Sequence, residues 1–236
     1  MRDVTATPLR ERNDPRQYDD LATSWWDTRG PFAMLHWIAE ARARHLPTPR
    51  PGARLLDVAC GGGLLAKHTS GYAHVGVDLQ RPGLQQARAH GVAVVQADAT
   101  RLPFADASFD VVVAGEVLEH VRDPWTVVRE ACRVLAPGGT LVVDTIASTW
   151  WGRFSAITMA ERLPAGPPPR LHDGALFIDR HQLVATAAAA GVPLRLFGLR
   201  PSALDYVRWL AGRRADVRMV PVRSTAGLFQ AVGVKA

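Results

Sequence analysis

The stretch ARLLDVACGGGLLAKH, residues 53–68, decides the fold. It starts as an apolar run, turns at three consecutive glycines and continues into a helical pattern. Glycines at a strand-to-helix turn let a ligand approach the backbone closely, because no side chain fills that space. The nicotinamide fingerprint GxGxxG is absent, since Leu64 and Leu65 follow the glycines. The turn therefore predicts a ligand site of a different kind.

Working outward from this stretch, short apolar runs alternate with helical stretches. The apolar runs are residues 53–59, 73–79, 92–98, 109–116 and 139–146. Such alternation predicts a parallel sheet built from strand-helix-strand units. We therefore expect an α/β domain over residues 51–236.

Two segments flank or interrupt this pattern. Residues 1–50 hold clustered aromatics followed by apolar residues at helical spacing, which predicts an N-terminal helical cap joined by the proline-rich linker 47–52. Residues 146–177 form an insertion that is too long for an ordinary connection between a strand and a helix. We interpret the insertion as a lid over a substrate pocket and expect one structural domain overall.

Composition excludes several classes of protein. The chain has 236 residues, 47% of them hydrophobic, which is enough for a full core. No apolar run reaches the length of a membrane span and the N-terminus is too polar for a signal peptide, so we expect a cytoplasmic protein. The net charge of +6 comes from scattered arginines, which makes a nucleic-acid partner unfavourable. A monomer and a homodimer both stay open.

Acidic residues mark the carboxyl ends of three predicted strands. Asp57 lies at the glycine turn, Asp78 ends the second run about 20 residues later, and Asp98 follows the third. An acidic residue at the second position can accept hydrogen bonds from ribose hydroxyls. Open α/β sheets bind ligands in the crevice beyond these strand ends, so the three carboxylates predict one nucleotide site.

This ordered set, with LAPGGTLVV after it, closely resembles the class I S-adenosylmethionine (SAM)-dependent methyltransferases over about residues 53–145. The resemblance implies a Rossmann-like, mostly parallel seven-stranded sheet with helices on both faces. It also implies SAM as cofactor and S-adenosylhomocysteine as product. The residues it assigns to SAM are Asp57, Ala59, Gly61 and Gly63 for the methionine part, Asp78 and Leu79 for the ribose, Asp98 and Ala99 for the adenine, and Glu116.

The fourth apolar run leads into Glu116-Val117-Leu118-Glu119-His120. If a helical turn begins here, Glu116, Glu119 and His120 share one face, because positions three and four residues apart are neighbours on a helix. Two carboxylates and an imidazole can bind magnesium, manganese or zinc. The alternatives are that His120 is a lone general base or a packed side chain.

The ExxEH motif resembles that of the UbiG family of ubiquinone-biosynthesis O-methyltransferases, and also the metal motif of small-RNA 2′-O-methyltransferases. The segment SWWDTRGPFAMLHWIAEAR resembles a UbiG-type stretch with two tryptophans before a Leu-His pair. The resemblance implies His172 as a fourth metal ligand and a catalytic residue beside Glu119 and His120. The residues expected near the substrate are Trp26, His36, Arg42 and Trp151.

These patterns predict a SAM-dependent O-methyltransferase acting on a small aromatic catechol or hydroxyquinone, assisted by a divalent metal, in quinone or specialised metabolism. An apolar lid face also suggests peripheral contact with a membrane. Two alternatives stay open. One is a methyltransferase for a carbon or nitrogen acceptor or an RNA 3′ end, with His120 as general base, and the other is a non-catalytic SAM-binding regulatory module.

Overall fold

A central sheet organises the computed structural model, which describes residues 10–236. Its strands are β1 (Arg54–Val58), β2 (Ala73–Asp78), β3 (Ala93–Gln96), β4 (Phe109–Gly115), β5 (Leu135–Ile146), β6 (Leu194–Pro201), β7 (Met219–Val222) and β8 (Leu228–Val234). The strand order is β3-β2-β1-β4-β5-β8-β6-β7. Strands β1 to β5 pair in parallel, which confirms the α/β prediction.

The sheet has eight strands, so the predicted number of seven is wrong by one. The additional strand is β7, whose residues pair antiparallel with Gly198–Pro201 at the edge of β6. Pro221 lies in β7 opposite Leu199. A proline cannot donate a ladder hydrogen bond and is tolerated on an edge strand, which is where β7 lies. Strand β8 is antiparallel to both of its neighbours, β5 and β6.

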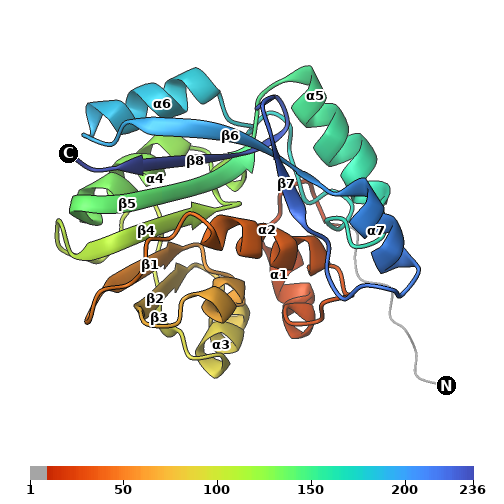
Figure 1. Cartoon of the computed structure of the whole chain (residues 1–236), viewed down its shortest axis with the longest axis horizontal. Helices are drawn as coiled ribbons and strands as arrows, with labels where there is room; N and C mark the ends of the chain where they lie inside the picture. Colours follow the sequence, from red (N-terminus) through yellow and green to blue (C-terminus); the bar gives the residue numbers. More distant parts are fainter. Residues whose placement is uncertain (1–9) are drawn as a thin grey trace.

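Helices cover both faces of the sheet, as expected. The longer helices are α2 (Ala33–Ala43), α3 (Arg81–Ala89), α4 (Pro124–Val134), α6 (Arg180–Ala189) and α7 (Ala203–Leu210). The shorter helical segments are α1 (Arg16–Asp20), η1 (Ala22–Ser24), η2 (Leu64–His68), η3 (Leu118–His120), α5 (Trp150–Arg153), η4 (Phe154–Met159) and η5 (Ala160–Arg162). Helices α4 and α6 bury Val127, Ala131 and Leu183 in the main core. Helix α2 crosses the opposite face (Figure 1).

Chain order produces a switch point between β1 and β4. The chain proceeds outward from β1 through β2 to β3, and then returns to place β4 on the other side of β1. Connections at the carboxyl ends of β1 and β4 therefore diverge and leave a crevice between them. The glycine turn follows β1 and the segment that begins at Glu116 follows β4, so both predicted motifs lie at this crevice.

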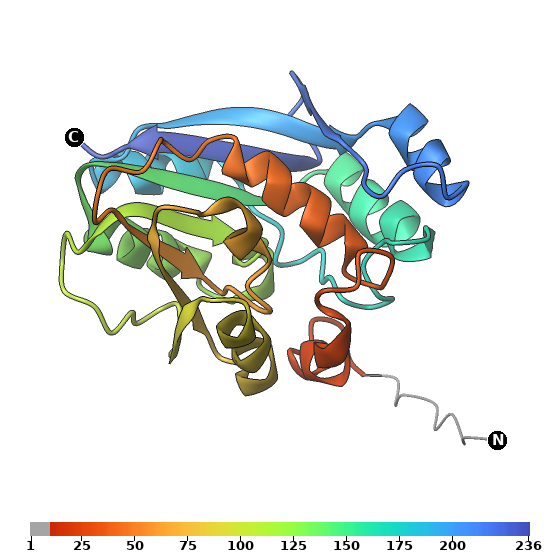
Figure 2. The same cartoon turned by 60° about the horizontal axis from the view of Figure 1, so that its bottom comes forward.

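The N-terminal cap is helical, although its first nine residues lie outside the described part. Helix α2 buries Trp37 and Ile38 against Trp209 and Met219 of the C-terminal segment. Figure 2 shows α1 and α2 beside the carboxyl ends of the parallel strands. The cap therefore forms a wall of the crevice.

Trp26 and His36 of the cap contact the glycine turn and the residues around it. The Trp26 indole stacks on His90 with ring centroids 3.5 Å apart, and its Nε1 donates to the Gly62 carbonyl over 2.9 Å. The His36 ring bridges Lys67 Nζ, 3.1 Å from Nδ1, and the Trp25 carbonyl, 2.9 Å from Nε2. These interactions attach the cap to the turn, and neither Trp26 nor His36 borders the cavity at the carboxyl ends of the parallel strands; their contact with the substrate stays a prediction.

The lid prediction matches an irregular helical segment followed by a loop. Helix α5, η4 and η5 run over Trp150–Arg162, and a segment without regular helix or strand continues to α6. Ala156 and Phe177 bury a small cluster together with Ile146, which attaches the lid to the end of β5. Across residues 10–236, we find no helix with the length and apolarity needed to traverse a bilayer.

His36 predicts a measurable dependence of stability on pH. Lysine has hydrogen-bond donors alone, so the imidazole accepts at Nδ1 and donates from Nε2. Burial, and secondly the charge of Lys67, lower the pKa of His36 to about 4. This pKa lies below the value of about 6.5 in the unfolded chain. The contribution of His36 to the free energy of unfolding is therefore complete above about pH 6.5 and is lost as the pH falls toward 4.

The test compares the free energy of unfolding of the wild type and His36→Gln between pH 7 and pH 4. Glutamine keeps a donor for the Trp25 carbonyl but does not titrate. Allowing for solvent screening, we expect the advantage of the wild type to shrink by about 1–2 kcal/mol over this range. A difference that stays constant with pH would show that His36 is not held neutral by these partners.

Candidate functional site

A cavity of about 760 Å³ opens at the carboxyl ends of β1, β2 and β4. Most of the predicted site residues line it: Arg42, Asp57, Ala59, Gly61, Asp78, Leu79, Asp98, Ala99, Glu116, His120, Trp151 and His172. Trp26, His36, Gly63 and Glu119 are absent from its lining. The cavity therefore brings the glycine turn, the ExxEH motif and the lid together.

At one end of the cavity, backbone geometry arranges the turn after β1. Ala59 and Gly61 have φ of 56° and 49°, in the left-handed region that favours glycine. A Cβ on Gly61 would lie 2.5 Å from the Trp25 ring, so a side chain there would displace the cap. A Cβ on Gly63 would lie 2.8 Å from the Cα of Ala87, so this glycine permits α3 to pack against the turn rather than bordering the ligand.

Asp78 links the turn to the end of β2. Its Oδ2 accepts from the Gly61 amide over 2.9 Å, and its Oδ1 accepts from the Gln80 amide over 2.8 Å. Burial raises the pKa of Asp78, and the two amides oppose that shift. Asp98, at the end of β3, is exposed and accepts from the Thr100 amide and hydroxyl. Two acidic side chains thus border the same end of the cavity.

The other end of the cavity holds a buried ion pair. The Arg42 guanidinium from α2 donates from Nε and Nη2 to the two oxygens of Asp144 in β5, each over 2.6 Å. Gly115 permits this approach, because a Cβ there would lie 2.0 Å from the Arg42 Cζ. Arg42 borders the cavity as predicted, but two of its nitrogens already bind a protein carboxylate.

Glu116 follows β4 with φ of 52°, and the helical turn that succeeds it covers Leu118–His120 alone. The predicted helical face shared by Glu116, Glu119 and His120 is therefore wrong. Glu119 is fully buried away from the cavity, where its Oε2 accepts from the Thr145 hydroxyl over 2.8 Å. Burial raises the pKa of Glu119 to about 7, and burial with the charges of Glu119 and Asp144 raises that of Glu116.

His120 faces the cavity between partners from the N-terminal segment. Its Nδ1 lies 2.6 Å from Asn13 Oδ1, and its Nε2 lies 3.1 Å from the Tyr18 hydroxyl. The ring stacks beside that of His172 with centroids 5.4 Å apart. Burial, followed by the charge of His172, lowers the pKa of His120 to about 3. The imidazole is therefore neutral.

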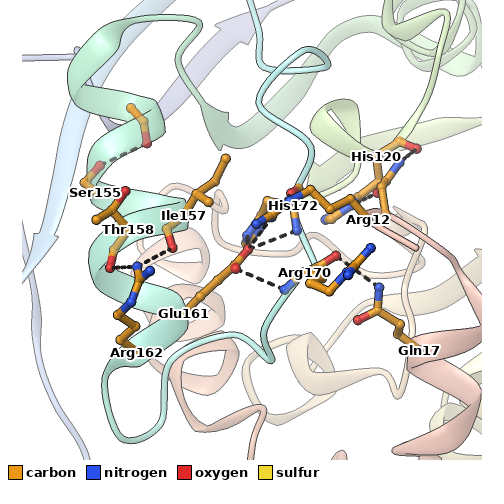
Figure 3. Close-up of polar contacts among 12 residues, drawn as sticks. Arg12, Gln17, His120, Ser155, Ile157, Thr158, Glu161, Arg162, Arg170 and His172 are labelled. Carbon is orange, nitrogen blue, oxygen red and sulfur yellow. Dashed lines mark hydrogen bonds and ion pairs between the residues drawn. The ribbon is translucent and has the colours of Figure 1, made fainter. Parts of the chain in front are cut away.

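Glu161 of the lid contacts both the backbone of His172 and its ring, with Oε1 3.9 Å from Nδ1 (Figure 3). Glu161 accepts from the Arg170 amide over 3.0 Å and from the His172 amide over 3.4 Å, while Arg12 Nη1 donates to the His172 carbonyl over 2.8 Å. Burial, followed by the charge of Arg12, lowers the pKa of His172 to about 4. His172 thus presents a second neutral imidazole to the cavity.

The four predicted metal ligands are not assembled around one point. In the part of the chain that the structure describes, no three histidine, cysteine, aspartate or glutamate side chains are arranged to hold a metal ion. Three buried atoms in this region nevertheless lack a hydrogen-bond partner among the described residues: Glu116 Oε1, Glu119 Oε1 and His172 Nδ1. Two carboxylate oxygens and an imidazole nitrogen fit a divalent cation in their chemistry, although not in their present arrangement.

Several residues of this site were missed by the sequence reasoning. Asn13, Tyr18 and Arg12 come from a polar stretch whose pattern carries no signal of a site. Asp144 did carry one, since a lone carboxylate in the apolar run 139–146 needs a buried partner. That partner, Arg42, is 102 residues away in sequence.

Comparison with known proteins identifies the family of this chain. Residues 56–143 match the family described as Methyltransferase domain. The ubiquinone biosynthesis O-methyltransferase of Ralstonia nicotianae is 37% identical over 198 residues, which cover 78% of this chain and 82% of the relative. The protein of the same name from Caulobacter sp. strain K31 is 33% identical over 231 residues, covering 86% and 90%.

Solved structures support the fold. A SAM-dependent methyltransferase from Thermotoga maritima, described as a possible histamine N-methyltransferase, aligns with a TM-score of 0.67 at 20% identity, covering 94% of this chain and 97% of that one. The [4+2]-cyclase SpnF aligns with a TM-score of 0.60 at 20% identity, covering 97% of each. Their differing descriptions show that this fold alone does not determine the reaction. The sequence identity to the curated relatives, over most of both chains, places this chain in the UbiG family of ubiquinone biosynthesis O-methyltransferases, which are class I SAM-dependent methyltransferases.

Proposed function

We propose that this methyltransferase transfers the methyl group of SAM to a hydroxyl oxygen of a small aromatic catechol or hydroxyquinone. The observation that carries the proposal is the shared cavity, in which the Asp78 end and the neutral imidazole of His120 border one continuous space. An acceptor between them would have the cofactor on one side and a proton acceptor on the other. The relatives' O-methyltransferase names support oxygen as the accepting atom.

In this proposal SAM occupies the end formed by the glycine turn. Asp57, Ala59 and Gly61 would contact its methionine part, Asp78 and Leu79 its ribose, and Asp98 and Ala99 its adenine edge; all seven border the cavity. Gly63 would act indirectly, by letting α3 approach the turn. We call the end at the glycine turn and Asp78 the cofactor end, and the end at His120 and His172 the reaction end. Glu116 lies where the two ends meet, next to the ion pair of Arg42 and Asp144.

The reaction places two demands on the protein. The sulfonium methyl is already electrophilic, so the acceptor oxygen must lie in line behind it and must lose its proton. His120 Nε2, whose partner in this structure is the Tyr18 hydroxyl 3.1 Å away, would take that proton once the acceptor hydroxyl replaces Tyr18, as the oxygen bonds to the methyl carbon. The bond between this carbon and sulfur breaks, its electron pair stays on sulfur, and S-adenosylhomocysteine leaves. General-base catalysis of this type contributes typically about 10²–10⁴-fold.

The remaining walls suit an aromatic acceptor. Apolar side chains from the cap, the lid and the C-terminal strands border the reaction end: Met34, Ile38, Met159, Leu163, Leu199, Met219 and Leu228. Such walls bind a ring by excluding water, whereas an oligonucleotide needs a basic groove with stacked aromatics. This lining favours a small acceptor over an RNA 3′ end.

A divalent cation belongs to the proposal because Glu116 Oε1, Glu119 Oε1 and His172 Nδ1 are buried without hydrogen-bond partners among the described residues, although these atoms are not arranged around one point in this structure. Glu116, Glu119, His120 and His172 would hold it. When bound, such an ion would lower the pKa of a coordinated hydroxyl and orient it. The protein contributes two neutral imidazoles, which is the form that metal binding requires.

The cofactor assignment predicts that Asp78→Ala weakens SAM binding by about 1–3 kcal/mol, because the ribose hydroxyls lose a buried acceptor. Isothermal titration calorimetry measures this loss as a rise in the dissociation constant. Asp216→Ala is the matched control, since it removes an exposed carboxylate that pairs with Arg214 outside the cavity. Unchanged affinity in Asp78→Ala, with native thermal unfolding, would remove Asp78 from the site.

Metal removal gives a second prediction. Exhaustive treatment with a chelator should abolish turnover of a catechol and leave SAM affinity largely intact, because the glycine turn, Asp78 and Asp98, which hold the cofactor in this proposal, are not among the proposed metal ligands. Magnesium, manganese or zinc should restore turnover. His172→Ala should raise the metal concentration needed for half-maximal activity, whereas His181→Ala, an exposed histidine on α6, should not. Full activity of demetallated protein would exclude the cation and leave His120 as the base.

A third prediction concerns the outer face of the lid, which we propose makes peripheral contact with a membrane. Trp150 is 73% accessible there and does not border the cavity. Co-sedimentation with anionic liposomes should fall when Trp150 is replaced by serine, because an interfacial indole is lost. Val234→Ser removes an exposed apolar side chain from β8 and serves as the control. Equal sedimentation of all three proteins would contradict membrane contact through the lid.

A further inference from the structure

Residues 10–20 form a strap whose polar contacts converge on the reaction end of the cavity. Asn13 makes two hydrogen bonds with one residue of the reaction end: its Nδ2 donates to the His120 carbonyl over 3.0 Å, and its Oδ1 lies 2.6 Å from His120 Nδ1. Tyr18, five residues later, places its hydroxyl 3.1 Å from His120 Nε2. Both ring nitrogens of His120 are thus contacted from the strap.

The contacts of Asn13 determine its orientation. The NH₂ group of a side-chain amide donates and its oxygen accepts, whereas a backbone carbonyl oxygen can only accept. Because Asn13 Nδ2 meets the His120 carbonyl, Oδ1 is the atom that meets the ring. If the amide were reversed, Asn13 Oδ1 would face the His120 carbonyl oxygen, and neither oxygen could donate. Asn13 Oδ1 must therefore accept, and His120 Nδ1 must carry the hydrogen.

This hydrogen fixes the character of the other ring nitrogen. In a neutral imidazole one nitrogen donates and the other holds a lone pair, and the partner of the first selects the tautomer. With Nδ1 protonated, the lone pair lies on Nε2, which faces the cavity and accepts from the Tyr18 hydroxyl. Burial raises the pKa of Tyr18, so this hydroxyl stays a donor.

The strap is itself held by the lid. The Asn13 amide donates to the Arg170 carbonyl over 3.0 Å, and Gln17 Nε2 donates to the same carbonyl over 3.1 Å (Figure 3). Asn13 also adopts φ of 58°, a left-handed conformation that asparagine tolerates better than most residues. Its position is therefore set by two elements distant in sequence from the ExxEH motif.

We propose that Asn13 is a positioning residue for the methyl transfer, which holds His120 in the tautomer with hydrogen on Nδ1 and the lone pair on Nε2. This inference rests on the proposed role of His120. The same lone pair is needed whether His120 accepts the hydroxyl proton or binds a cation, so the role of Asn13 does not depend on which of these is correct. In this role Asn13 acts through His120.

The decisive measurement is the tautomer of His120, read from the ring-nitrogen chemical shifts of the full chain labelled with ¹⁵N-histidine. His120→Gln identifies the signals. We expect the wild type to have hydrogen on Nδ1 and Asn13→Ala to lose that preference. Asn13→Asp keeps an acceptor toward Nδ1 but loses the donor to the His120 carbonyl, so it should restore the preference in part. Gln17→Ala is the matched control, because it removes a bond between strap and lid without touching His120.

Steady-state kinetics supply the second readout. In Asn13→Ala we expect kcat to fall about 10–100-fold, the usual effect of losing the partner that orients a functional histidine. The KM for SAM should stay within about twofold, because the cofactor end is unchanged. Asn13→Asp should recover part of the loss. A structural role alone would instead lower thermal stability and alter both KM and kcat.

The outcomes separate this inference from the function on which it rests. Hydrogen on Nε2 in the wild type, or an unchanged tautomer in Asn13→Ala, would overturn the inference. A changed tautomer with unchanged kcat would leave Asn13 as the residue that selects the tautomer and would overturn the catalytic role proposed for His120. A changed tautomer with reduced kcat and rescue by Asn13→Asp would support both.

Discussion

The buried ion pair between Arg42 and Asp144 is the interaction on which the site depends. It joins the cap helix to the central strand β5, and the Asp144 side chain is fully removed from solvent. Taking both charges out of water is costly, and the pair offsets that cost through two short hydrogen bonds. Losing either residue would leave the other charged and buried. The cap and the sheet therefore have one compatible arrangement, which encloses the cavity.

This pair also determines the electrostatics of the reaction end. Asp144 and Glu119 lie close enough to Glu116 to raise its pKa, and Arg42 is the cation whose charge opposes that shift. Arg42 directs two of its five N–H donors to Asp144, and no hydrogen bond from its other donors to Glu116 is present among the described residues. The structure accordingly has more buried carboxylates than cations at this point. A protonated glutamate or a bound divalent ion are the two physical ways to balance them, which explains why the metal requirement is the informative measurement.

The sequence was most informative where local pattern determines structure. Short apolar runs that alternate with helical stretches identified the parallel strands, and the acidic residues at their carboxyl ends border one cavity because parallel strands place those ends together. It was least informative where one residue has two plausible partners. Nothing in the pattern around Trp26 and His36 distinguishes a substrate from His90 and Lys67, which the fold brings against them from other elements.

The ExxEH motif shows why spacing alone misled. The argument for a shared face requires helical backbone at every position, yet Glu116 takes a left-handed conformation as the chain leaves β4. That conformation leaves Glu116 at the cavity, while Glu119 is directed toward Thr145 inside the sheet. His120 is instead oriented by Asn13, 107 residues earlier in the chain. A short motif therefore supplies the chemical groups, whereas the N-terminal strap and the lid decide which of their atoms face the reaction.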